Sequence, residues 1–169
     1  MSMVPDTLTN MNLHIAGRSY AGKVSQLQLP KLKRKTESHR GGGTDAEVDM
    51  AVGLEKLEGG FSLTGFDRES LSYFGLADGG GFNGTFRGAF TDRRGKVVGV
   101  EVDFRGLLTE VDMGTWEPGK KNETKYNISL DYYKLAADGA VVFEMDPLNN
   151  IRVIDGKDEL AAERAALGI

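Results

Sequence analysis

Cysteine is absent from this 169-residue chain, so it has neither a disulfide framework nor a thiolate metal site. No stretch approaches the roughly 20 consecutive apolar residues that a membrane-spanning helix needs. Residues 1–10 also lack the charged start and apolar run of an export signal. We therefore expect a protein made in the cytoplasm, with no stable membrane association.

A basic excess is also missing, because 21 lysines and arginines stand against 25 aspartates and glutamates, giving a net charge of −4. A dedicated nucleic-acid-binding protein carries the opposite balance. Any contact with DNA should therefore be loose or repulsive.

No catalytic constellation stands out. The only histidines, His14 and His39, belong neither to an HExxH-like motif nor to a recognisable Ser-His-Asp arrangement. Four carboxylates recur at every second position of two segments, as on a solvated sheet face rather than in an acid–base pair; they are Glu47, Asp49, Glu101 and Asp103. We predict a protein that is not an enzyme, with no catalytic residue, no metal and no cofactor.

The run Gly79–Gly84 fits the letters of the dinucleotide-binding fingerprint, GxGxxG. That fingerprint needs a strand before the glycines and a helix after them, so that a helix N-terminus points at the pyrophosphate. Here the order is reversed, because a predicted helix precedes the glycines and a predicted strand follows them. The run is better interpreted as a connector.

Glycine is frequent, at 23 residues, and proline is rare, at 4, and the glycines punctuate short alternating apolar and polar runs. This profile predicts one mainly β domain over residues 1–169. From Lys31 to Val52 the alternation predicts a long two-faced hairpin, with a glycine tip at residues 41–43. The apolar face of its return strand is assigned to Val48, Met50 and Val52.

A second long hairpin is predicted from Phe82 to Arg105, around a turn at residues 92–95. Two short helices accompany the strands. Asp67 should cap the first, whose Leu71, Phe74 and Leu76 would cover the sandwich, and the second should run from about Asp158 to Leu167. The expected core face combines both hairpins; it consists of Val48, Met50, Phe86, Phe90, Val98, Val100, Val102 and Phe104.

The order of several short blocks resembles the tube proteins of contractile phage tails, and more closely those of R-type bacteriocins (tailocins). The blocks begin with Leu29-Pro30-Lys31-Leu32, Arg40-Gly41-Gly42 and Val48-Asp49-Met50-Ala51-Val52-Gly53. They continue with Phe86-Arg87-Gly88, Arg105-Gly106-Leu107-Leu108, Tyr132-Tyr133-Lys134-Leu135 and Glu144-Met145-Asp146-Pro147. Each block alone is a weak motif, but together they span essentially the whole chain.

The resemblance implies a β-sandwich or barrel flanked by helices, and a hexameric ring in which the long hairpins join into a lumen β-barrel. It implies a self-assembling structural subunit of an inner tail tube, which conducts DNA in a phage or ions in a bacteriocin. The implied partners are other copies, the contractile sheath protein, the baseplate and tail terminator proteins, the tape measure protein in the lumen, and genomic DNA in transit. The implied location is a virion tail or bacteriocin particle, assembled in the host bacterial cytoplasm.

Alternation then assigns the residues of the lumen wall, whose charges sum to a weakly negative value. The predicted lumen-facing residues are Lys33, Lys35, Glu37, Glu47, Asp49, Arg87, Glu101, Asp103 and Arg105. The predicted contacts between subunits or rings are made by Gly41, Gly42, Gly43, Asp45 and Trp116. For Trp116, packing within its own chain stays open. A monomeric β-barrel that binds a small ligand is the alternative from another functional class.

Overall fold

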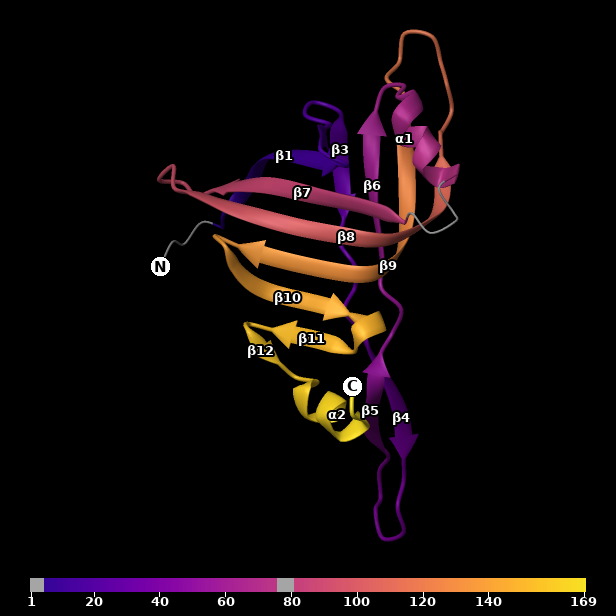
Figure 1. The fold of residues 1–169 in the computed structure, drawn as a ribbon, viewed down its shortest axis with the longest axis vertical. Coiled ribbons are helices and arrows are strands. Elements are labelled where there is room, and N and C mark those ends of the chain that lie inside the picture. Colours follow the sequence, from indigo (N-terminus) through magenta and orange to yellow (C-terminus); the bar gives the residue numbers. More distant parts are fainter. Residues whose placement is uncertain (1–4, 76–80) are drawn as a thin grey trace.

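The computed structural model describes residues 5–75 and 81–169, and within them a mainly antiparallel β protein with short helical segments (Figure 1). The N-terminal strands and helices are β1 (Thr7–Ile15), β2 (Arg18–Ser19), β3 (Val24–Gln28), β4 (Arg34–His39), β5 (Val48–Leu54), β6 (Glu58–Thr64), α1 (Arg68–Ser72) and η1 (Tyr73–Gly75). The remainder are β7 (Phe82–Thr91), β8 (Val97–Asp112), β9 (Glu123–Ala137), β10 (Ala140–Asp146), η2 (Pro147–Asn149), β11 (Ile151–Ile154), β12 (Lys157–Asp158) and α2 (Ala161–Leu167).

The main sheet has ten strands, and its continuous path runs β12-β11-β10-β9-β8-β7-β1-β2. Strand β9 is the branch point, because β6 pairs with its first half and β10 with its second, while β8 lies along the other side. Strand β3 extends the β6 branch. In Figure 1 the β3–β6 arm crosses the curved β7–β10 sheet. The predicted mainly β class is confirmed.

The core lies between the curved sheet and the β3–β6 arm, and it is rich in aromatic rings. Phe86 and Phe104 come from neighbouring strands with ring centroids 5.4 Å apart, and Phe61 stacks on Tyr126 at 4.6 Å. Leu13 completes the centre with no exposed surface. These residues alternate with polar ones along their strands, which is why one sheet face is buried and the other is wet.

Two expectations about the core are confirmed in part. The β7–β8 pairing matches Phe86 with Val102 and Arg87 with Glu101, as the alternation predicted. The core assignments of Phe86, Val102 and Phe104 are confirmed, whereas Phe90, Val98 and Val100 are only half-buried. The assignment of Val48 and Met50 to the subunit core is wrong, because both lie on a hairpin that projects from the main sheet.

The predicted N-cap of the first helix is confirmed. The Asp67 carboxylate accepts hydrogen bonds from the backbone N–H groups of Glu69 (3.0 Å) and Ser70 (3.2 Å). Its other oxygen accepts from the Lys23 ammonium at 2.7 Å. Leu71 packs against the core, but Phe74 is 50% exposed, so its predicted covering role is wrong. Leu76 lies outside the described residues.

The second helix begins later than predicted. Lys157–Asp158 pairs with β11 as β12, and the Asp158 carboxylate then accepts from the Leu160 N–H at 3.1 Å, so α2 starts at Ala161. Leu160 is half-buried, whereas Leu167 is 62% exposed.

Replacing Phe104 by alanine should lower the free energy of unfolding by about 3 to 5 kcal/mol, because the ring has no exposed surface and leaves a cavity when removed. Phe74→Ala is the matched control and should cost less than about 1 kcal/mol, because the half-exposed ring leaves no closed cavity. Urea unfolding measures both. Equal losses for the two variants would contradict this assignment of the core.

Asp67 should make stability depend on acid pH. Burial opposes ionisation of this carboxyl, but the Lys23 hydrogen bond, the Ser70 N–H and the Arg18 charge outweigh it and hold its pKa below the usual 3.8. The resulting stability is present above that pH and is lost as the pH falls through the folded-state pKa. Asp67→Asn keeps the cap and removes the charge. At neutral pH the free energy of unfolding of this variant should be about 1 kcal/mol lower than that of the wild type, a modest loss because solvent screens the half-exposed partners Lys23 and Arg18. On acidification the stability of the variant should fall less than that of the wild type.

Candidate assembly surfaces

The β4–β5 hairpin projects from the main sheet as a separate two-stranded sheet, at the lower end of the long axis in Figure 1. Its return strand exposes three large apolar side chains, Val48 (61%), Met50 (50%) and Val52 (48%). A lone two-stranded hairpin is at best marginally stable in water, and exposed apolar strands pair readily with other chains. The hairpin therefore has the properties of an assembly element.

The cross-strand pairing of this hairpin corrects part of the face assignment. Glu37 lies opposite Met50, and Ser38 lies opposite Asp49, whose carboxylate accepts its hydroxyl hydrogen bond at 2.9 Å. Residues that face each other across a ladder share one side of the sheet. Glu37 thus shares a face with Met50, and Asp49 lies on the other face, so the expectation that the two carboxylates lie together is wrong.

The predicted glycine tip and Asp45 do form the connection between β4 and β5. Gly43 has φ = 88°, a conformation that L side chains rarely adopt, and the Thr44 N–H donates to the Gly41 carbonyl at 3.3 Å. Residues 41–49 contain three carboxylates and no lysine or arginine. Arg40, which directly precedes these residues, donates through Nε to the Thr44 carbonyl at 3.4 Å, so the tip also carries one basic side chain.

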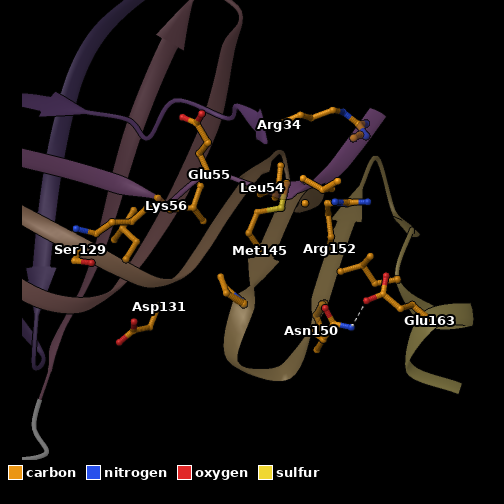
Figure 2. A pocket seen from close by; sticks show the side chains of 18 residues that line it. Arg34, Leu54, Glu55, Lys56, Ser129, Asp131, Met145, Asn150, Arg152 and Glu163 are labelled. Atoms are coloured by element: carbon orange, nitrogen blue, oxygen red, sulfur yellow. Dashed lines mark hydrogen bonds between the residues drawn. The ribbon is translucent and has the colours of Figure 1, made fainter. Parts of the chain in front are cut away.

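A groove of about 700 Å³ lies where the hairpin joins the body. Figure 2 shows Leu54 and Met145 at its apolar centre, with Arg34 reaching in from the hairpin and Arg152 from β11. Asn150 donates to the Glu163 carboxylate of α2 at 3.3 Å along the groove edge. Apolar floor and charged rim together are typical of a protein contact, but no three groups here form a catalytic arrangement.

The second predicted hairpin does not project as the first one does, because its strands β7 and β8 lie within the main sheet between β1 and β9.

The side of β7–β10 that faces away from the core is polar, and we call it the polar face. Its residues are Thr85, Arg87, Glu101, Asp103, Arg105, Tyr132, Lys134 and Glu144. Four of the predicted lumen residues thus lie together on it: Arg87, Glu101, Asp103 and Arg105. Lys33, Lys35, Glu37, Glu47 and Asp49 lie on or beside the separate hairpin.

Charges on the polar face are paired across strands. Arg87 Nε is 3.2 Å from Glu101 Oε2, and the Thr85 hydroxyl donates to Asp103 at 2.7 Å. Lys134 lies between Asp103 and Glu144 in the register. The face carries three basic and three acidic side chains, so it is neutral as a whole.

Tyr132 contacts two charged side chains of the polar face, Arg105 and Glu144. The Arg105 guanidinium lies 4.2 Å from the centre of its ring, and its hydroxyl donates to Glu144 at 2.9 Å. Burial and this hydrogen bond raise the pKa of Tyr132 to about 12, so the phenol remains a donor at neutral pH. Tyr132, Lys134 and Glu144 were not predicted to belong to the polar face. The sequence does carry a signal for them, because they alternate with Tyr133, Leu135 and Met145 as residues of a solvent-facing side alternate with core residues.

At the other end of the long axis, the β8–β9 connection meets the residues before α1 (Figure 1). Trp116 and Phe66 pack there edge to face with centroids 6.1 Å apart, so part of the question left open for Trp116 is resolved by a contact within the chain. Both rings nevertheless remain exposed, at 58% and 64%.

The two histidines lie in different sheets, and the glycine run falls partly outside the described residues. His14 is on β1 and His39 ends β4 in the other sheet. Residues 79–80 of the glycine run lie outside the described part. In residues 5–75 and 81–169, no group of three or more His, Asp or Glu is placed to hold a metal ion, and no helix is long and apolar enough to cross a membrane.

A similar fold is found in chains of contractile injection machines. A chain from the sheath–tube complex of an extracellular contractile injection system (PVC), in its extended state, superposes with a TM-score of 0.60. The match covers 80% of this chain and 93% of that one at 10% sequence identity, so the likeness concerns the fold. The fold class is therefore one that this chain shares with a component of a contractile injection system.

Sequence comparison gives the family. The model of the phage tail tube protein FII family matches residues 5–168, and the chain belongs to this family. The chain is 34% identical to the tail tube protein of Escherichia phage P2, over 98% of this chain and 99% of that protein. It is 30% identical to the major tail tube protein of Serratia phage KSP20, over 92% and 91% of the two chains. The family resemblance in the sequence is confirmed.

Proposed function

We propose that this chain is a structural subunit of the inner tube of a contractile phage tail or a phage-tail-like bacteriocin, folded as one tube domain over residues 1–169. The observation that carries the proposal, beside family membership, is the projecting hairpin with its exposed Val48, Met50 and Val52. Such a hairpin is an unfavourable feature in a monomer, and a neighbouring copy would cover it. Family membership also favours the tube over a monomeric ligand-binding barrel.

In this proposal the copies form hexameric rings that stack into a tube, and the tube contacts sheath, baseplate and terminator proteins. Related structures are described as a sheath–tube complex, a terminator and a baseplate of such machines, which supports these partners. The subunit performs no chemistry. It assembles in the bacterial cytoplasm around a tape measure protein, and the finished tube conducts DNA in a phage or ions in a bacteriocin.

The polar face lines the lumen in this arrangement. Four strands per subunit, at about 4.8 Å spacing and a tilt near 40°, give a hexameric wall roughly 50 Å across, which leaves room for duplex DNA. Because the polar face carries three basic and three acidic side chains, the wall it forms is proposed to be neutral rather than weakly negative. A neutral, internally paired wall gives DNA no excess of cations to bind by counterion release, so DNA slides.

Sedimentation and negative-stain microscopy over a concentration series test the assembly. We expect rings or tubes to form without partners, whereas a ligand-binding barrel would remain monomeric. Reversing Glu101 and Asp103 to lysine should then spare assembly and slow DNA ejection in a phage, or change ion passage and killing in a bacteriocin. Neighbouring capsid and terminase genes would identify a phage. Failure of the wild-type protein to form any oligomer at high concentration argues for the barrel.

A further inference from the structure

We propose that Tyr132 is a positioning residue of the tube wall: its ring holds the Arg105 guanidinium against the sheet and so withholds this cation from a polyanion such as DNA in the bore. The proposal rests on the proposed function, because it concerns the wall that the polar face forms. It adds the residue that keeps a wall with three cations per subunit from adhering to DNA.

Arg105 is the cation of the polar face that has no carboxylate opposite it. The other two, Arg87 and Lys134, each lie opposite a carboxylate in the ladder. The neighbours of Arg105 across the ladder are instead Asn83 on β7 and Tyr132 on β9. Within residues 5–75 and 81–169, no aspartate or glutamate forms an ion pair with Arg105.

Tyr132 stands where the carboxylate partner is missing. The guanidinium carbon of Arg105 lies 4.2 Å from the centre of the ring, within the roughly 6 Å over which an aromatic ring attracts a cation. The phenol hydroxyl donates to Glu144 at 2.9 Å, which fixes the far end of the ring. Glu144 and Asp103 lie on either side of Lys134, so this group has one surplus negative charge. Tyr132 thus joins the unpaired positive charge of the wall to its surplus negative charge.

Arg105 is also the group of the wall best suited to bind DNA. A guanidinium has five N–H donors in one plane and binds phosphate oxygens in a bidentate manner, and charge-assisted bonds of this kind are strong. Arg105 is exposed, whereas Tyr132 is half-buried. A phosphate in the bore must draw the guanidinium away from the ring, and this cost recurs in every subunit that the DNA passes. The stack therefore weakens adhesion without removing the charge.

Two substitutions separate the ring from the hydroxyl. Tyr132→Phe keeps the ring and loses the Glu144 hydrogen bond, whereas Tyr132→Leu loses both and keeps an apolar side chain in the strand. In assembled tubes, we expect Tyr132→Leu to bind a short fluorescent DNA duplex about tenfold more tightly than the wild type at low salt, with a steeper salt dependence. Tyr132→Phe should stay within about threefold of the wild type. Weaker or unchanged binding by normal Tyr132→Leu tubes overturns the proposal.

Arg105 variants show whether the effect runs through this side chain. Adding Arg105→Gln to Tyr132→Leu should return DNA binding to within about threefold of the wild type. Arg105→Gln alone should change binding by less than about threefold, because a withheld arginine contributes little. This single variant keeps the proposal open to refutation if Tyr132→Leu does not fold, since a larger loss of binding contradicts it.

The contact itself can be measured by NMR in the free subunit, below the concentration of assembly. Protons that lie over an aromatic ring resonate upfield, so the Arg105 side-chain signals should be shifted upfield in the wild type and in Tyr132→Phe, and not in Tyr132→Leu. Unshifted signals in the wild type overturn the proposal and leave the tube function intact. Failure of the wild-type protein to form tubes contradicts the proposed function instead, and with it the wall.

Discussion

Gly106→Ala is expected to prevent the subunit from folding. A Cβ atom at this position of β8 would stand 2.0 Å from the Ser129 carbonyl oxygen and 2.9 Å from the Leu130 Cα of β9. Both are backbone atoms of the strand paired with β8, at a bulge in the register, so no side-chain rotation relieves the clash. The two long strands would have to separate at the branch of the sheet. We expect a loss of more than about 3 kcal/mol, seen as insoluble protein or a collapsed melting temperature.

Gly99→Ala is the matched control in the same strand. A Cβ atom there meets no atom within 4 Å, and the φ of this glycine is not positive. Its melting temperature should stay within a few degrees of wild type, with a change below about 0.5 kcal/mol. Equal behaviour of the two variants would show that β8 and β9 are not packed as described.

The second large effect concerns assembly rather than folding. Val48→Thr, Met50→Gln and Val52→Thr together should prevent tube formation at the concentration at which the wild-type protein assembles, while leaving the subunit folded. Burying each of these half-exposed side chains against a neighbour is worth about 1 kcal/mol, so the triple change should raise the concentration for assembly roughly 100-fold. Sedimentation measures assembly, and circular dichroism with thermal melting measures the fold.

Leu148→Gln provides the control for general surface hydrophobicity, because Leu148 is 78% exposed on η2 and is not part of the hairpin. It should assemble as wild type does. A hairpin variant that forms tubes at the wild-type concentration would remove the hairpin from the interface and leave its exposure unexplained.

The parts of the fold that follow from local chemistry could be predicted from the sequence. The Asp67 cap and the Arg87–Glu101 register are local consequences of side-chain hydrogen bonding and alternation. Likewise, the Asp138–Gly139 turn follows from two residues that tolerate the positive φ observed there.

The parts that failed depend on relations between segments. Alternation within β4 and within β5 does not say which face of one meets which face of the other, and the long tip and a bulge after Lys35 decide that Glu37 opposes Met50. Phe74 has the spacing of a buried helix position, but the segment turns into η1 and leaves the ring half-exposed. The branching of β9 is also invisible in the sequence, so Lys134 and Glu144 were not assigned to the polar face.

The central claim is that copies of this chain form a tube with the polar face toward the bore and the hairpin between copies. A high-resolution reconstruction of tubes assembled from the purified protein tests it most directly. We expect Arg87, Glu101 and Asp103 on the bore surface, with Val48 and Met50 covered by a neighbouring copy. A map with Val100 and Val102 lining the bore, and with Glu101 and Asp103 buried between subunits, would contradict both the register and the proposed wall.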